Sequence, residues 1–209
     1  MAGYFFQGTG LGELESHMRQ VPGFLPHRSG IIRGKEKQEL SAPYGELVRL
    51  FLEEIPPSRL SVRILNLKNR GEATGFMFRD NQHKMRFRQF FGSGAYDFLY
   101  SDHGQAAAVF LLSADPFLWE RAKPYITENG IRHGEIRVHG IEPEGYALFC
   151  GAKEMCGGQP RLSLSELGDP ELVGDGLLRV LLNGILISRH GIRILAEQKE
   201  NEGRRDGKE

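Results

Sequence analysis

The spacing of apolar residues along the chain predicts helices in three places. Apolar residues recur at helical spacing over 41–54, and Pro56 follows the end of this segment. A second helix is predicted over 115–128, where an aspartate that can cap the helix precedes Pro116 at the first helical position. A third is predicted over 169–188, again behind a capping aspartate and mostly apolar, with a narrow polar stripe.

Other segments have the pattern of strands. Apolar and polar residues alternate over 59–67, which is typical of a half-buried strand. The continuous apolar run over 106–113 suits an interior strand that is buried on both faces. Shorter strands are predicted at 97–100 and 192–195.

Two pairs of segments are predicted to form hairpins. One hairpin joins 74–79 to 84–90 through four residues that favour turns, and the other joins 131–139 to 146–152. About seven strands and two or three helices follow from this count. Because hairpins outnumber strand–helix–strand crossovers, the predicted fold class is α+β, a mainly antiparallel sheet packed by helices.

The predicted organisation is a single α+β domain over 1–196, in which 1–40 form a glycine- and proline-rich N-terminal arm. The segment 197–209 is highly charged and poor in apolar residues, so a disordered charged tail is expected. An apolar content of 40% and a charged content of 26% are typical of a packed globular protein.

Charge and cysteine content narrow the predicted surroundings of the chain. The 27 basic and 27 acidic residues give zero net charge, so no overall field attracts nucleic acid or an anionic membrane. Low net charge also favours a homo-oligomer or a permanent partner. With two cysteines, no signal-peptide pattern and only interrupted apolar stretches, the sequence predicts a cytoplasmic protein without a membrane segment.

The first predicted hairpin separates apolar from basic residues. A four-residue turn would pair Phe76 with Phe87 and Phe78 with Met85 on one face, leaving a basic stripe on the other. Such a stripe suits an acidic or phosphate-bearing partner. The predicted binding residues are Arg79, Lys84, Arg86 and Arg88, with Arg137 on the second hairpin.

The second predicted hairpin carries the candidate catalytic residues. Its register would bring His133, Glu135 and Cys150 to one face, within reach of one another. An imidazole beside a carboxylate suits general acid–base chemistry, and an imidazole beside a thiol suits nucleophilic catalysis. The alternative is a solvent-facing sheet surface with a half-buried cysteine.

No cofactor or metal site is predicted. The glycine-rich segment 8–12 is followed by Glu13, where a dinucleotide fingerprint needs glycine and a P-loop needs lysine. Cys150 and Cys156 have five residues between them, whereas strong zinc motifs place two to four residues between their cysteines.

Three functional hypotheses remain open. The first is a non-catalytic binding or accessory module that engages a protein or nucleic-acid partner through the basic hairpin face. The second is an enzyme, a hydrolase or transferase, acting on a phosphorylated or nucleotide-like substrate at the polar face of the 131–152 hairpin. The third is a structural subunit whose helix over 170–188 docks against a copy of itself.

Overall fold

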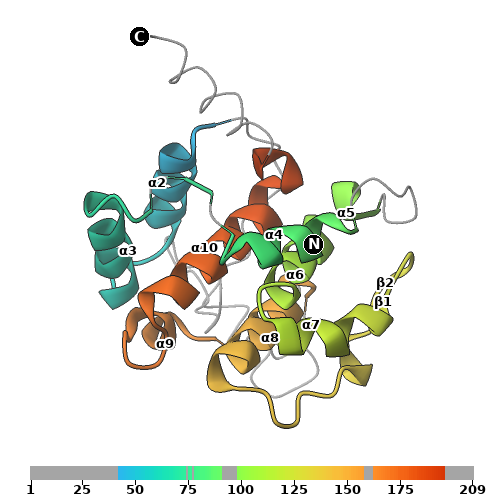
Figure 1. Cartoon of the computed structure of the whole chain (residues 1–209). Coiled ribbons are helices and arrows are strands. Elements are labelled where there is room, and N and C mark those ends of the chain that lie inside the picture. Colours follow the sequence, from blue (N-terminus) through green and yellow to red (C-terminus); the bar gives the residue numbers. More distant parts are fainter. Residues whose placement is uncertain (1–41, 74, 77, 91–97, 158–161, 196–209) are drawn as a thin grey trace, which may run out of the picture.

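Helices make up most of the computed structural model, which describes residues 42–73, 75–76, 78–90, 98–157 and 162–195 (Figure 1). The α-helices of this part of the chain are α2 (Tyr44–Glu54), α3 (Arg59–Asn69), α4 (Asn81–Arg88), α5 (Phe98–Ser101), α6 (His103–Leu112), α7 (Pro116–Ala122), α8 (Pro143–Met155), α9 (Leu164–Gly168) and α10 (Asp175–His190). Short 3-10 turns are η1 (Lys123–Tyr125), η2 (His133–Glu135) and η3 (Ile192–Leu195).

The predicted α+β class with a seven-stranded antiparallel sheet is wrong. Among the described residues the sheet consists of two short strands, β1 (Ile126–Thr127) and β2 (Gly130–Ile131). The strands are antiparallel, with Ile126 opposite Ile131. The segments predicted as the remaining strands are mostly helical, so the fold is a helical assembly.

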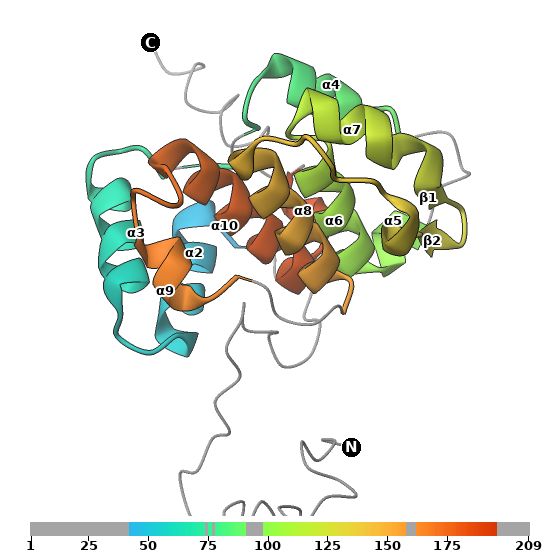
Figure 2. The ribbon, with the colours of Figure 1, turned by 90° about the horizontal axis from the view of Figure 1, so that it is seen from below.

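Helices α6, α8 and α10 lie together in the middle of the molecule (Figure 2). Every residue of the apolar run from Ala106 to Leu112 in α6 is fully buried. The helices approach closely because small residues lie where they meet: a Cβ added at Gly184 of α10 would lie 2.7 Å from the Leu111 side chain. The interior strand predicted over 106–113 is therefore wrong, although the predicted burial on all sides is confirmed.

Helices α2, α3 and α9 gather at one end of the molecule, away from β1 and β2 (Figures 1 and 2). The strand predicted over 59–67 is instead helix α3. Its buried residues Leu60, Ile64 and Leu67 have helical spacing. Ser58 and Ser61 form a reciprocal capping box that satisfies backbone N–H groups at the start of the helix.

Both predicted hairpins are wrong. The residues predicted as the first turn begin helix α4, where the Asp80 side chain accepts a hydrogen bond from the backbone N–H of His83. The predicted strand over 146–152 lies inside α8, which begins with Pro143 at its first position. The short strands predicted at 97–100 and 192–195 are replaced by helix α5, over the described residues 98–101, and by the 3-10 turn η3.

The three predicted helices are present, with differences at their ends. Helix α2 ends at Glu54, before Pro56, as predicted. Helix α7 begins at Pro116 behind the cap Asp115, as predicted, but ends at Ala122. Helix α10 begins at Asp175 rather than at Asp169, whose side chain instead accepts from the backbone N–H of Glu171 in a turn.

The N-terminal arm over 1–40, the capping residue Ser41 and the tail over 197–209 lie outside the described residues. The single-domain organisation over 1–196 therefore stays a prediction. None of the helices in the described part of the chain combines the length and the apolar character required to cross a membrane.

Candidate functional site

A pocket of about 140 Å³ lies where the chain before α4 meets the first turns of α8 and α10. We call it the α10 pocket. Its walls combine apolar side chains, charged side chains and glycine backbone. The lining residues are Phe78, Arg79, Glu144, Gly174, Gly176, Leu177, Arg179 and Val180.

The charged residues of the α10 pocket come from three separate parts of the chain. Arg79 Nη2 donates to Glu144 Oε2 at 2.6 Å. Arg179 Nη1 donates to the backbone carbonyl of Glu72 at 3.3 Å. The walls thus hold two guanidinium groups and one carboxylate, so their net charge favours an anionic ligand group.

His83 fixes the backbone of Arg79 at the pocket. The backbone N–H of Arg79 donates to His83 Nδ1 at 2.9 Å, and His83 Nε2 lies 2.9 Å from the Phe110 carbonyl oxygen. Nε2 must therefore carry the proton and donate to that carbonyl. Burial lowers the pKa of His83 to about 4, so the ring is neutral at pH 7 and both of its nitrogen atoms are satisfied.

The apolar wall of the pocket continues into the core through aromatic rings. The ring of Phe78 lies 5.6 Å from that of Phe110 and 5.7 Å from that of Phe87, measured between centroids. These distances are in the range of favourable aromatic pairs. Phe76, Phe78 and Phe87 each pack against Phe110 of α6. The predicted pairing of Phe78 with Met85 on an apolar hairpin face is wrong, because Met85 is 59% exposed on α4.

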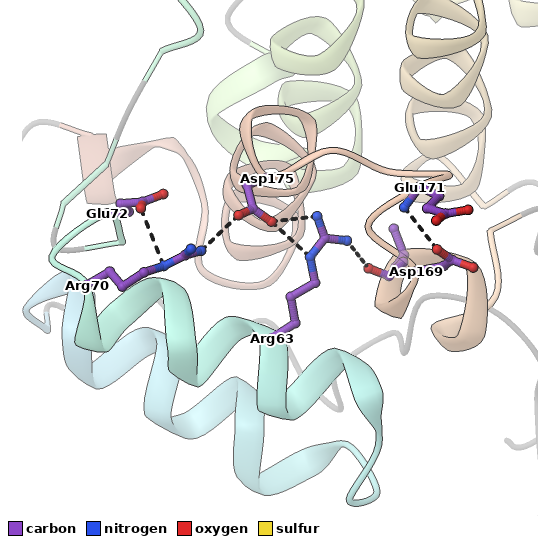
Figure 3. Close-up of polar contacts among 7 residues, drawn as sticks. Arg63, Arg70, Glu72, Asp169, Glu171 and Asp175 are labelled. Atoms are coloured by element: carbon purple, nitrogen blue, oxygen red, sulfur yellow. Dashed lines mark hydrogen bonds and ion pairs between the residues drawn. The ribbon is translucent and has the colours of Figure 1, made fainter.

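An ionic cluster holds the start of α10 against α3 (Figure 3). Asp175 Oδ1 accepts from Arg63 Nη2 at 2.6 Å, and its Oδ2 accepts from Arg70 Nη2 at 2.8 Å. Arg63 Nη1 also donates to the carbonyl of Leu167 in α9 at 3.1 Å. Asp175 is therefore occupied by α3 while its neighbours Gly174 and Gly176 line the pocket.

Replacing Asp175 with asparagine is expected to lower the free energy of unfolding by about 1 kcal/mol at neutral pH, a modest cost because solvent partly screens the cluster. Hydrogen bonds from Arg63 are the main cause that lowers the pKa of Asp175 below its ordinary value of 3.8. A carboxyl group whose pKa is lower in the folded state than in the unfolded state stabilises the fold at pH values above its ordinary pKa. This stabilisation is lost as the pH falls through the folded-state pKa.

Urea unfolding at several pH values measures this effect. The stability gap between the wild type and D175N should be constant near neutral pH and should close as the pH falls below 3.8. The matched control is E171Q, which removes an exposed carboxylate and should change stability by less than about 0.5 kcal/mol. A gap that persists unchanged in acid would contradict the role assigned to Asp175.

The glycines of the α10 pocket leave room for a ligand. A Cβ built at Gly174 or at Gly176 meets nothing within 4 Å. Gly176 lies in the first turn of α10 without a positive φ, so a larger residue fits its backbone there. A side chain at this position therefore begins in open space beside the other residues that line the pocket.

The predicted basic stripe does not form a hairpin face. Arg79 lies at the α10 pocket, whereas Lys84, Arg86 and Arg88 lie on helix α4. Arg86 Nε donates to the carbonyl of Ser113 at 2.7 Å, so its guanidinium is partly used by the core. Lys84 and Arg88 are four residues apart and share a face of α4, with Arg88 exposed. Whether these residues bind a partner stays a prediction.

Arg137 lies apart from that group in the sequence, in the loop between η2 and α8. It is exposed, and its carbonyl accepts a hydrogen bond from Arg121 Nη1 at 3.2 Å. Arg137 does not line the α10 pocket.

The hairpin register that was predicted to join His133, Glu135 and Cys150 does not exist. The first two residues belong to the 3-10 turn η2, where Glu135 pairs with Arg132 at 3.1 Å. Cys150 is buried in α8. None of the three lines the α10 pocket, and an enzymatic site at these residues stays a prediction.

His133 is partly buried beside α8. Its ring centroid lies 6.4 Å from that of Phe149 in α8. Burial, with a smaller effect of Lys153, lowers the pKa of His133 to about 4, so the ring is uncharged at neutral pH. Among the described residues, His, Cys, Asp and Glu side chains form no cluster suited to a metal ion.

Several residues of the site were not predicted from the sequence. Glu144 follows Pro143, and an acidic residue just after a proline is typical of the first turn of a helix. Arg179 lies in the polar stripe of the third predicted helix, between Asp175 and Asn183. These signals locate two helix positions, but nothing in the sequence indicates that Glu144 and Arg79 meet.

Comparisons with protein-family models, with curated proteins and with solved structures find no match to this chain. The α10 pocket brings together two arginines, one carboxylate and apolar side chains.

Proposed function

We propose that this chain is a non-catalytic binding module that engages a partner protein at the α10 pocket. The proposal depends on one observation: the α10 pocket combines two arginines, Arg79 and Arg179, with apolar side chains and with glycines that leave open space. Binding sites typically combine apolar walls with a few polar groups that fix the orientation of the ligand.

A protein fits these surroundings better than nucleic acid. The chain has zero net charge, so no overall field attracts a phosphate backbone. The elements beside the pocket carry exposed apolar side chains, Met85 on α4 at 59% exposure and Tyr146 on α8 at 47%. Methionine, tyrosine and arginine are enriched in protein–protein interfaces.

We also propose a reducing compartment such as the cytoplasm. Cys150 and Cys156 are not joined to each other by a disulfide. Cys150 is buried in the core, and Cys156 Sγ lies 3.6 Å from the carbonyl oxygen of Gly104. Two structural thiols with no disulfide between them suit a compartment that keeps cysteines reduced.

The test uses the full chain as bait, followed by affinity measurements with the purified partner that it retains. G176L fills the pocket and R79E reverses its charge, so each should weaken binding by roughly tenfold or more, as expected for central interface residues. G134L and R59E make the same changes at exposed positions outside the pocket lining and should bind like the wild type.

Three results would contradict the proposal. The first is a partner that binds all four variants equally. The second is a failure of the chain to retain any partner that can be reconstituted from purified proteins. The third is binding of nucleic acid at physiological salt that R79E removes, which would favour a nucleic-acid partner instead. Circular dichroism and thermal unfolding of each variant establish that it is folded.

A further inference from the structure

Arg79 and Glu144, which both line the α10 pocket, form an ion pair at 2.6 Å. We infer that Glu144 stands in for a carboxylate of the partner, and that an aspartate or glutamate side chain of the partner displaces it from Arg79 on binding. This inference rests on the proposed function. It specifies that the pocket recognises a carboxylate, and that the internal ion pair lowers the affinity of the chain for its partner.

The ion pair joins two elements that lie far apart in the sequence. Arg79 precedes α4 and Glu144 lies in the first turn of α8, 65 residues later in the chain. The Arg79 side chain is 37% exposed and the Glu144 side chain 51% exposed. Exposed ion pairs contribute little to stability, because solvent screens them. A competing carboxylate can therefore replace Glu144 at a small cost in free energy.

The two ends of the pair are held differently. The backbone of Arg79 is held by its hydrogen bond to the buried His83, so its side chain always begins at the pocket. Glu144 lies near the positive end of the α8 helix dipole, which continues to stabilise its carboxylate after Arg79 is lost. Glu144 is therefore the group that moves when a second carboxylate arrives.

The remaining walls indicate what accompanies that carboxylate. Arg179 supplies the second positive charge, while Leu177 and Val180 supply an apolar floor. The nearby carboxylate of Asp175 is already bound by two arginines of the α3 end, so it does not compete for the arginines of the pocket. An acidic side chain followed by an apolar residue matches this arrangement.

The probe is a blocked dipeptide, N-acetyl-Glu-Leu-amide, titrated into the isotope-labelled full chain and followed by NMR. Its uncharged counterpart, N-acetyl-Gln-Leu-amide, should bind at least roughly fivefold more weakly, because it lacks a charge-assisted hydrogen bond to Arg79. R79M should lose about tenfold in affinity for the acidic dipeptide, and G176L should lose it too, for steric reasons.

The distinguishing variant is E144Q, which removes the internal competitor. It should bind the acidic dipeptide about two- to fivefold more tightly, the range that an exposed ion pair is worth. The matched control is E142Q, which removes the same charge at a position two residues before Glu144. The Glu142 side chain makes no capping hydrogen bond at the start of α8. E142Q should leave the affinity close to that of the wild type.

The outcomes separate this inference from the proposed function. An affinity that E144Q leaves unchanged or weakens overturns the inference, as does an equal gain in E142Q, which would indicate a general charge effect. Equal binding of the two dipeptides, or binding of neither, also overturns it. The proposed function is tested separately, by whether G176L and R79E weaken the binding of the partner protein.

Discussion

Replacing Phe110 with alanine is expected to lower the free energy of unfolding by about 3–5 kcal/mol, as for other large aromatic residues in a packed core. Phe110 is completely buried in α6, and its carbonyl oxygen faces His83 Nε2. Four rings lie within 6 Å of its own ring, measured between centroids: Phe76, Phe78, His83 and Phe87. A loss of this size is a large part of the stability of an ordinary domain.

Urea unfolding followed by circular dichroism measures the effect of F110A. The matched control is F117A, because Phe117 is 48% exposed on α7 and its main contact is with the guanidinium of Arg121. F117A should cost no more than about 1 kcal/mol. Equal losses for the two variants would contradict the packing described for α4 and α6.

Gly191→Ala is expected to cost about 2–4 kcal/mol, from backbone strain and a steric clash together. Gly191 ends α10 with φ +82° and ψ 174°, a conformation that residues with a side chain rarely adopt. A Cβ at this position would also lie 2.6 Å from Nε2 of the buried His103. The strain belongs to the Gly191 backbone itself, and relief of the clash requires the buried His103 ring to move.

Thermal unfolding measures the stability of G191A against that of the matched control G134A. Gly134 has no positive φ, and a Cβ there meets nothing within 4 Å, so G134A should be close to the wild type in stability. A stable G191A would contradict the close contact between the end of α10 and the start of α6.

The failure of the sheet prediction has a physical cause in the short apolar patterns of this chain. Leu60, Val62 and Ile64 alternate with polar residues, but the first and third of them are also one helical turn apart. In the structure Leu60 and Ile64 are buried, whereas Val62 is 57% exposed. A stretch this short fits a strand or a helix, and only tertiary packing decides between them.

Capping aspartates were a second source of error. The turn predicted within the first hairpin includes Asp80, but in the structure Asp80 caps α4 by accepting from the backbone N–H of His83. Asp115 caps α7 and is followed by Pro116, as predicted, whereas Asp169 is followed by Pro170 and lies in a turn. An aspartate before a proline is therefore compatible with both structures, since its short side chain accepts from backbone N–H groups in each.

The candidate site was only partly predictable for the same reason. Arg79 was expected to bind and does line the pocket, but its neighbours there come from residues 144 and 174–180. Their convergence depends on how α8 and α10 pack, which no local pattern specifies. The catalytic prediction for His133 and Cys150 depended on strand pairing, and it lost that support when α8 replaced the strand.

The burial of α6 has a consequence for the chain during its synthesis. The run from Ala106 to Leu112 is covered largely by α8 and α10, both of which leave the ribosome after it. Until translation has passed His190, the helices that bury this apolar segment are incomplete. Exposed apolar segments of nascent chains aggregate or bind chaperones. Truncation anywhere before the end of α10 should therefore leave a polypeptide that chaperones bind and cells degrade.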